Sequence, residues 1–231
     1  MGGRVHIDQA AEEALSSRSF GGIAHDVRGA VGVVSGALDE LERTFVGDAA
    51  IANAALLALA RRGVARLIGT ADRCAVLAAF SRPPDPVVAD VGEVFALAMT
   101  AADAAYGRRA VRVIPATEHG AAAIEARALQ VALSDATVLA IKVARTEVLG
   151  RLAVDSGGLK VSLVADAESD WLEQSWSARA WLTEESQDHT LLAMRVLDVV
   201  AHRHGGSVHI GSGEGATTIE FHLPSTMTRR P

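Results

Sequence analysis

Two long amphipathic patterns open the chain, and only the dipeptide Gly47-Asp48 separates them. Between residues 8 and 46, apolar side chains recur at steps of three and four, which predicts one continuous helix. The same kind of spacing predicts a second helix over residues 49–80. The stretch "RPPDP" at 82–86 ends this region, because proline lacks a backbone donor and restricts the residue before it. Two long helices joined by a short turn predict an antiparallel hairpin.

A helical hairpin of this kind cannot cover its own apolar stripe. On the first helix the stripe comprises Phe20, Ile23, Ala24, Val27, Val31, Val34, Leu38, Leu41 and Phe45. Two copies of the hairpin can bury their stripes against each other in a four-helix bundle. We therefore expect a homodimer.

After the prolines the pattern changes to strands interleaved with helices. Helices are predicted over 87–105, 123–145 and 187–204, a strand over 109–115, and strand hairpins over 151–166 and 207–224. The turn of the first hairpin is "DSGG", which no helix follows, so a phosphate-binding loop is not expected there. This order predicts a small α/β sandwich with helices on one face of a sheet.

Charge and cysteine content exclude several classes of function. The 231 residues carry a net charge of −6, which argues against a nucleic-acid binder held by phosphate contacts. Cys74 is the sole cysteine, so there is neither an internal disulfide nor a multi-cysteine zinc site. The sequence shows no signal-peptide core and no apolar run of membrane-spanning length, so we expect a cytoplasmic protein that does not bind membranes.

One histidine of the first helix is surrounded by glycines. Gly21, Gly22, Gly29, Gly32 and Gly36 stand at −4, −3, +4, +7 and +11 from His25, which places them on the same helix face. Each glycine costs the helix about 0.5–1 kcal/mol relative to alanine. Two interpretations remain open at this point. The lack of side chains on this face lets a large partner reach His25, or the glycines let two helices approach closely.

The residues beside His25 suit transfer of a phosphoryl group. A neutral imidazole nitrogen is a good nucleophile near neutral pH. Asp26 can hold the proton of the other ring nitrogen, and Arg28, one turn further on, can contact an incoming phosphoryl group.

The segment "AHDVRGAVGVVSGALDELE" at 24–42 resembles the phosphoacceptor motif of the dimerisation and phosphotransfer domain of bacterial histidine kinases. It is more similar still to the kinase-derived two-domain histidine phosphotransferases of the ChpT type, whose helix reads His-Asp, Val-Gly, Leu and acidic residues. Two positions depart from the kinases: Ala30 stands where a proline is common, and Gly29 stands where Thr or Asn positions water for phosphatase activity.

The second half of the chain resembles the ATP-binding domain of the same kinases, with its nucleotide chemistry missing. The helix "ALQVALSDATVLAIKVAR" carries Val138 or Leu139 where the family has its magnesium-binding Asn. The adenine motif Asp-x-Gly-x-Gly becomes "ADAESDW", in which Asp166 is a remnant, and the next glycine-rich box becomes "DHTLLAMR". The resemblance therefore implies a degenerate ATPase domain that binds no cofactor.

The resemblance implies a division into a dimerisation and histidine-phosphotransfer hairpin (1–82), a degenerate kinase-ATPase-like domain (87–225) and a tail (226–231). It implies transfer of a phosphoryl group between receiver-domain aspartates through His25, without autokinase activity. The partners would be the receivers of response regulators and hybrid kinases, which bring their own Mg²⁺, and the glycine face would be their docking surface. A non-catalytic pseudokinase scaffold and a divergent ATP-dependent kinase are the alternatives.

Two further groups of residues stay open. Trp171, Trp176 and Trp181 replace the nucleotide lid, either as packing residues or as an aromatic anchor for a partner. Among the C-terminal histidines, His202 and His204 should point apart on their helix, whereas His209 and His222 are expected to be cross-strand neighbours. No carboxylate or thiol set accompanies them, so no metal site is expected.

Overall fold

A computed structural model describes residues 9–80, 82–106, 111–115, 120–155, 158–178 and 189–224. Within these ranges the side chains of 9–23, 26, 48–52, 155 and 189 are not described. The chain divides into two compact units, Met1–Pro83 and Pro84–Pro231, and each is described by itself.

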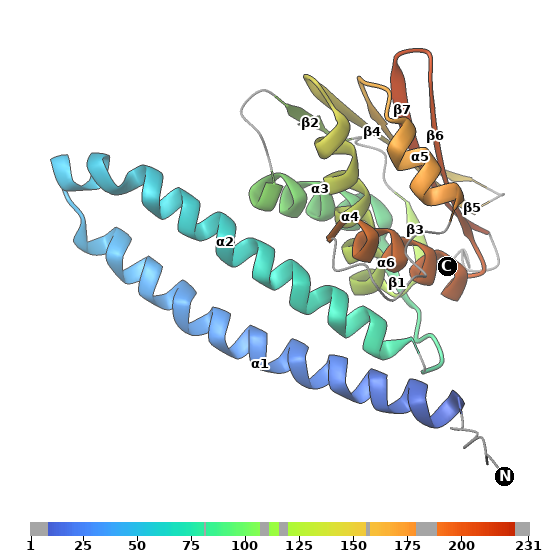
Figure 1. The fold of residues 1–231 in the computed structure, drawn as a ribbon, viewed down its shortest axis with the longest axis horizontal. Helices are drawn as coiled ribbons and strands as arrows, with labels where there is room; N and C mark the ends of the chain where they lie inside the picture. The colour runs from blue at the N-terminus through green and yellow to red at the C-terminus, as the bar shows by residue number, and fades with distance from the viewer. Residues whose placement is uncertain are drawn as a thin grey trace, which may run out of the picture. The chain divides into compact units, whose positions relative to one another are not determined.

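The first unit is a helical hairpin, as the apolar spacing predicts. Helix α1 (Gln9–Thr44) and helix α2 (Asp48–Ala79) lie side by side and run in opposite directions (Figure 1). Gly47 precedes α2 with φ of 60°, a left-handed conformation that glycine adopts without steric cost and that lets the chain reverse between the helices.

The apolar stripe of α1 is covered along one edge only. Ala24, Val31 and Leu38 follow each other at intervals of seven residues and are buried on the side that faces α2. Val34 and Leu41 belong to the neighbouring row of the same stripe, and their exposed fractions are 47% and 44%. A seven-residue repeat places both rows along one seam of the helix. Half of this seam is therefore packed and half is open.

The second unit is an α/β sandwich built on two sheets. The larger sheet has the order β2 (Arg112–Ile114), β4 (Glu147–Asp155), β5 (Gly158–Ala165), β7 (Ala216–Pro224) and β6 (Ser207–Gly213). The smaller pairs β1 (Val87–Asp90) with β3 (Ala121–Ile124). The helices are α3 (Val91–Tyr106), α4 (Ala126–Val143), α5 (Asp170–Ser177) and α6 (His189–Arg203).

Helices α3, α4 and α6 pack together and cover one face of the larger sheet (Figure 1). The strand residues on that face alternate with exposed or half-exposed residues, as period-two patterning requires. Phe95 of α3, Leu139 of α4 and Phe221 of β7 are among the largest fully buried side chains of this core. The predicted sandwich with helices on one sheet face is thus confirmed for the described residues.

The two C-terminal strand hairpins form where the sequence predicts them. Strands β4 and β5 pair from Val148↔Ala165 to Asp155↔Gly158, and residues 156–157 of the "DSGG" turn lie outside the described residues. Strands β6 and β7 meet at a two-residue turn in which Glu214 and Gly215 both have positive φ (53° and 82°). Positive φ at both central residues is typical of a type I′ turn, whose twist matches that of the antiparallel strands it connects.

The small sheet departs from the predicted elements. Residues 87–90 form β1, where the apolar spacing predicts the start of a helix, and residues 121–124 form β3 just before α4. Asp90 ends the strand and caps α3, because its Oδ1 accepts hydrogen bonds from the amides of Gly92 (2.8 Å) and Glu93 (3.3 Å). β3 consists mostly of alanine, which has little intrinsic preference for strands. Its pairing with β1, rather than its composition, makes it a strand.

In the part of the chain that the structure describes, we find no helix with the length and apolar character needed to span a membrane.

Candidate functional site

His25 lies exposed in the middle of α1, and the open glycines share its face. At 100° per residue, His25, Gly29, Gly32 and Gly36 fall within an arc of about 60°. The apolar row that contains Val34 lies on roughly the opposite side of the helix. The face of His25 is therefore neither the face packed on α2 nor the open apolar row.

The glycines of this face border empty space. A Cβ atom built on Gly29, Gly32 or Gly36 would have no atom within 4 Å, apart from neighbouring residues and the helix's own backbone. If these glycines allowed α1 and α2 to approach closely, a Cβ would collide with α2. Close packing within the hairpin therefore does not explain them, and the surface around His25 is bare helix backbone.

Arg28 lies at the rim between α1 and α2. Its Nη2 donates to Oδ1 of Asp72 on α2 at 2.7 Å. The Asp72 side chain is 8% exposed and the Arg28 side chain 47% exposed, so a largely buried carboxylate fixes a half-exposed guanidinium. Because Arg28 is three residues after His25, the ion pair anchors that guanidinium on the side of α1 adjoining the histidine.

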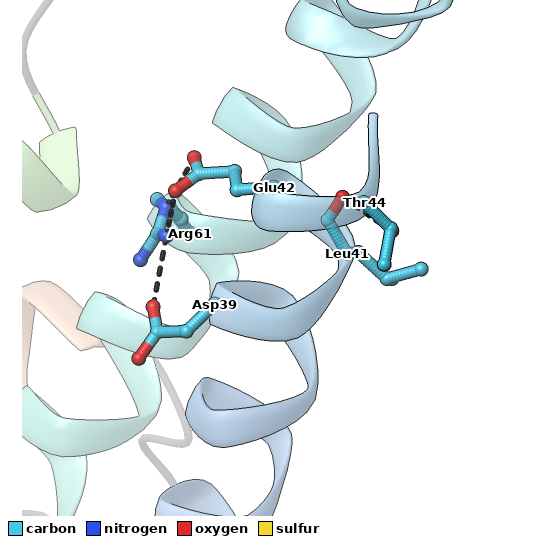
Figure 2. A network of polar contacts seen from close by, with 5 residues as sticks. All are labelled: Asp39, Leu41, Glu42, Thr44 and Arg61. Carbon is cyan, nitrogen blue, oxygen red and sulfur yellow. Dashed lines mark hydrogen bonds and ion pairs between the residues drawn. The ribbon is translucent and has the colours of Figure 1, made fainter. Parts of the chain in front are cut away.

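A second arginine closes the same rim further along the hairpin. Arg61 of α2 donates from Nε to Oε1 of Glu42 at 3.0 Å and from Nη2 to Oδ1 of Asp39 at 3.0 Å, and its Nη2 also contacts Oε2 of Glu42 (Figure 2). The hydrogen bond from Arg61 lowers the pKa of the Glu42 carboxyl and raises the pKa of Arg61 itself. These groups are exposed, so the network orients the two helices more than it stabilises them.

The two ion-pair clusters share one side of the hairpin. From Arg28 to Asp39 is 39 − 28 = 11 residues on α1, and from Asp72 back to Arg61 is 72 − 61 = 11 residues on α2. Eleven residues are close to three helical turns, so both clusters lie on one rim. The hairpin thus has a charged rim beside His25 and an apolar edge, with Val34 and Leu41, away from it.

The predicted site residues all belong to α1. The structure places His25, Arg28, Gly29, Gly32 and Gly36 on one side of the helix. The other three predicted residues also lie in α1, but the side chain of Asp26 and the surroundings of Gly21 and Gly22 are outside the described set.

Asp72 is the residue of this site that the sequence does not reveal. It follows Arg28 by 44 positions and lies on the other helix, so only the antiparallel register brings the pair together. The one sequence signal is a carboxylate within an otherwise apolar-rich part of α2.

Helix α4 places aliphatic side chains in the core of the second unit. Val138 and Leu139, which the sequence resemblance aligns with a magnesium-binding asparagine, are buried. Saturated side chains of this kind supply no oxygen ligand for Mg²⁺. The Asp166 carboxylate instead accepts hydrogen bonds from the Thr146 hydroxyl and from the amides of Arg145 and Thr146. These bonds, with the Thr146 hydroxyl first, hold the pKa of Asp166 well below its usual range.

A lysine links the two helices of this region. Lys142 Nζ, in the last turn of α4, donates to Thr190 Oγ1 at the start of α6 at 2.7 Å. Thr190 belongs to the segment "DHTLLAMR", and its side chain is buried. The hydrogen bond between Lys142 and Thr190 thus links the end of α4 to the start of α6.

The C-terminal histidines do not gather into a site. His202 is exposed and His204 is fully buried, so the expectation that they point apart is confirmed. His209 and His222 are diagonal rather than directly opposite neighbours on β6 and β7, because the register pairs His209 with Glu220 and His222 with Ser207. No cluster of three or more metal-binding side chains exists within the described ranges.

Burial lowers the pKa of His204, and its ring lies 3.7 Å from the carboxylate of Glu125. Glu125 itself forms a two-pronged ion pair with Arg203.

The tryptophans divide between exposed and undescribed positions. Trp171 is about half exposed and Trp176 partly exposed, both on α5. Trp181 lies outside the described residues.

Comparison with known proteins identifies the architecture. No family model and no curated protein matches the chain. Among solved structures, the Acinetobacter baumannii histidine kinase AdeS has a TM-score of 0.51 at 12% identity, covering 89% of this chain and 98% of that one. The chain has a histidine-kinase fold.

Full-length ShkA in complex with AMPPNP has a TM-score of 0.50 at 16% identity, covering 93% of this chain and 47% of ShkA. A histidine kinase from Burkholderia phymatum STM815 has a TM-score of 0.49 at 13% identity, covering 96% of this chain and 99% of that one.

The histidine-kinase fold describes both units in turn, a helical hairpin followed by an α/β sandwich. At these identities the likeness concerns the fold alone, and the chemistry must be read from the residues of this chain.

The ion pair beside His25 gives a test of the hairpin geometry. Substitution Arg28→Ala leaves the largely buried Asp72 carboxylate without its guanidinium, so we expect a loss of about 1–3 kcal/mol in the free energy of unfolding of the hairpin. Arg61→Ala is the matched control on the same rim, and its effect should be clearly smaller because its partners are exposed. Denaturant titration followed by circular dichroism at the helix band measures the difference. Equal effects of the two substitutions would contradict the assignment.

Proposed function

We propose that this protein is a histidine phosphotransferase of a two-component phosphorelay, which carries a phosphoryl group between receiver-domain aspartates on His25. The observation that carries the proposal is the exposed His25 on a helix face where Gly29, Gly32 and Gly36 leave open space. A receiver must bring its aspartyl phosphate to within bonding distance of the imidazole, and a bare helix surface permits that approach.

In the proposed transfer, the lone pair of one imidazole nitrogen of His25 attacks the phosphorus of the receiver's aspartyl phosphate. The nitrogen–phosphorus bond forms as the bond from phosphorus to the aspartate oxygen breaks, and the carboxylate leaves with its electron pair. The carboxylate of Asp26 holds the proton of the other ring nitrogen, and Arg28 offsets part of the phosphoryl charge. Transfer to a second receiver reverses these steps, and each receiver supplies its own Mg²⁺.

The second unit supports transfer without ATP. Buried Val138 and Leu139 offer no ligand to Mg²⁺, and Asp166 is engaged by the loop at Thr146. Lys142 is bonded to Thr190. We therefore propose that this unit retains the histidine-kinase fold as a scaffold and a receiver-contacting surface, and that the chain lacks autokinase activity.

We further propose that two copies pair through the open apolar edge of the hairpin. Val34 and Leu41 of α1 are about half exposed, and they complete the seven-residue repeat whose other row is packed on α2. A second hairpin laid on this edge forms a four-helix bundle. Because His25 lies on roughly the opposite side of α1, pairing leaves the histidine accessible.

The experiment that tests the function is transfer from a phosphorylated receiver. Purified protein is incubated with each of several receivers that carry labelled aspartyl phosphate, and acid-labile, base-stable label on the chain is measured. We expect label on the wild type and none on His25→Ala. If no receiver labels the wild type above His25→Ala, while the same receivers bind both forms equally, the protein is a non-catalytic scaffold. Calorimetry with ATP and Mg²⁺ tests whether the chain is instead a divergent ATP-dependent kinase. Micromolar affinity for ATP would indicate that it is.

The glycine face gives a graded test at a single position. Both Gly29→Ala and Gly29→Leu should stabilise α1, Ala by about 0.5–1 kcal/mol, because glycine is a poor helix former. Only leucine places a large side chain next to His25. We expect transfer to be nearly normal in Gly29→Ala and slowed at least tenfold in Gly29→Leu, as measured by initial rates of labelling. Equal rates in the two variants would show that the open face does not admit the receiver.

Substitutions at two adjacent residues, Val34 and Val33, test the proposed dimer interface. Val34→Glu places a charge on the open apolar edge, and we expect it to shift the protein from dimer to monomer. Val33→Glu is the matched control, since Val33 is 75% exposed and lies off the seven-residue repeat. Sedimentation equilibrium at several concentrations compares the two. A wild type that is monomeric, or a dimer that tolerates Val34→Glu, would rule out this interface.

A further inference from the structure

The two ion-pair clusters on the charged rim of the hairpin have opposite polarity. At the cluster nearer His25, the cation Arg28 is on α1 and the carboxylate of Asp72 is on α2. About three turns further along, the cation Arg61 is on α2 and its carboxylate partners are on α1 (Figure 2). Either arrangement can link two helices. The need to link them therefore does not explain why the cation beside His25 stands on the histidine's own helix.

The two clusters also differ in burial. The Asp72 side chain is largely buried, whereas those of Asp39 and Glu42 are about half exposed. The Arg28 side chain is itself about half exposed. The ion pair next to His25 therefore presents its positive member to solvent and keeps its negative member covered. At this ion pair, an arriving group meets the guanidinium rather than the carboxylate.

Arg28 keeps hydrogen-bonding capacity while it is bound to Asp72. A guanidinium has five N–H donors, and the contact at 2.7 Å is made by Nη2. Among the described residues, Asp72 is the only hydrogen-bond partner of Arg28. Guanidinium donors bind carboxylate and phosphate oxygens equally well. Nη2 can therefore stay on Asp72 while Nη1 or Nε donates to an oxygen of a phosphoryl group.

The place of Arg28 on α1 puts these donors within reach of a group on His25. Residues three apart on a helix have Cβ atoms about 5–6 Å from each other, which is less than the length of an extended arginine side chain. The ion pair with Asp72 restrains the guanidinium on this side of α1. Because the long side chain is already ordered, less of its conformational freedom is lost when it binds a phosphoryl group.

We propose that Asp72 is a positioning residue of the phosphotransfer site, which holds Arg28 so that the guanidinium bridges from the Asp72 carboxylate to the phosphoryl group on His25. This inference rests on the proposed function, since it concerns the phosphorylated form of His25. Asp72 acts through Arg28 and does not touch the phosphoryl group, because two anions repel each other. The bridge makes α2 part of a site whose other residues all lie on α1.

Phosphoramidate, a small phosphoryl donor that needs no receiver, tests the bridge on the full-length protein. An imidazole nitrogen of His25 attacks the phosphorus, a new nitrogen–phosphorus bond forms, and ammonia leaves with the electron pair of the bond that breaks. The measurement is the initial rate of base-stable phosphorylation at His25. Label on the other histidines is subtracted by means of His25→Ala.

A double-mutant cycle separates positioning from structural support. We expect Asp72→Ala and Arg28→Ala each to slow phosphorylation about tenfold, and the double variant to be no slower than Arg28→Ala alone. Loss of a purely structural carboxylate would slow the reaction whether or not Arg28 is present. If Asp72→Ala does not fold, as judged by circular dichroism, Asp72→Asn replaces it. Its amide oxygen can still accept from Arg28, so the expected loss is about threefold.

Phosphorus NMR of the labelled protein reports the contact itself. Relative to the wild type, the signal of phosphorylated His25 should move in the same direction in Asp72→Ala and in Arg28→Ala, since both variants take the guanidinium away from the phosphoryl oxygens. Arg61→Ala is the matched control, because it lies on the same rim about three turns away. It should leave the phosphorylation rate and the phosphorus signal unchanged.

Three results would overturn the bridge: phosphoramidate does not label His25, Asp72→Ala slows labelling equally with and without Arg28, or Asp72→Ala changes neither the rate nor the phosphorus signal. Failure of the proposed function looks different. If phosphoramidate labels His25 with the expected dependence on both residues but no receiver labels it, the bridge stands and the phosphorelay role falls. If receivers label His25 regardless of Arg28 and Asp72, the function stands and the bridge falls.

Discussion

The packing of Ala24, Val31 and Leu38 against α2 determines how α1 is rotated, and the rest of the hairpin follows from that rotation. With this row turned inward, the second apolar row lies along one edge and His25 lies near the other. The ion pairs of Arg28 and Arg61 then fall on the rim beside the histidine. The packed apolar row thus lies between the open apolar row and the face that carries His25.

The second unit of the histidine-kinase fold has an aliphatic core in the middle of α4. In α4, Val138 and Leu139 lie within a core that also contains Leu133 and Ile141. Aliphatic side chains at these positions are consistent with tight packing and require no buried hydrogen-bond partner. These positions of α4 therefore pack into the core without a buried polar group that would need a partner.

Periodicity predicts the long elements of this chain well, because a helix of thirty residues repeats its apolar pattern many times. The strands β1 and β3 have four residues each, too short for a pattern to stand out from the neighbouring helices. The face of His25 follows directly from helix geometry. Its ion-pair partner Asp72 does not, because contacts between helices depend on a register that spacing within one helix cannot supply. The pairing of His209 with Glu220 likewise depends on a register between strands.

The bare face around His25 has a consequence for the dynamics of α1. Without side chains at Gly29, Gly32 and Gly36, water reaches the backbone hydrogen bonds of three successive turns directly. Hydrated helix bonds lengthen on the solvent side, and glycine adds conformational freedom to the open state. Amide hydrogens in this stretch should exchange faster with solvent than those around Leu38, and a docked partner that excludes water should slow them. The glycines that leave open space beside His25 thus also make this stretch of α1 easier to open than the packed stretch around Leu38.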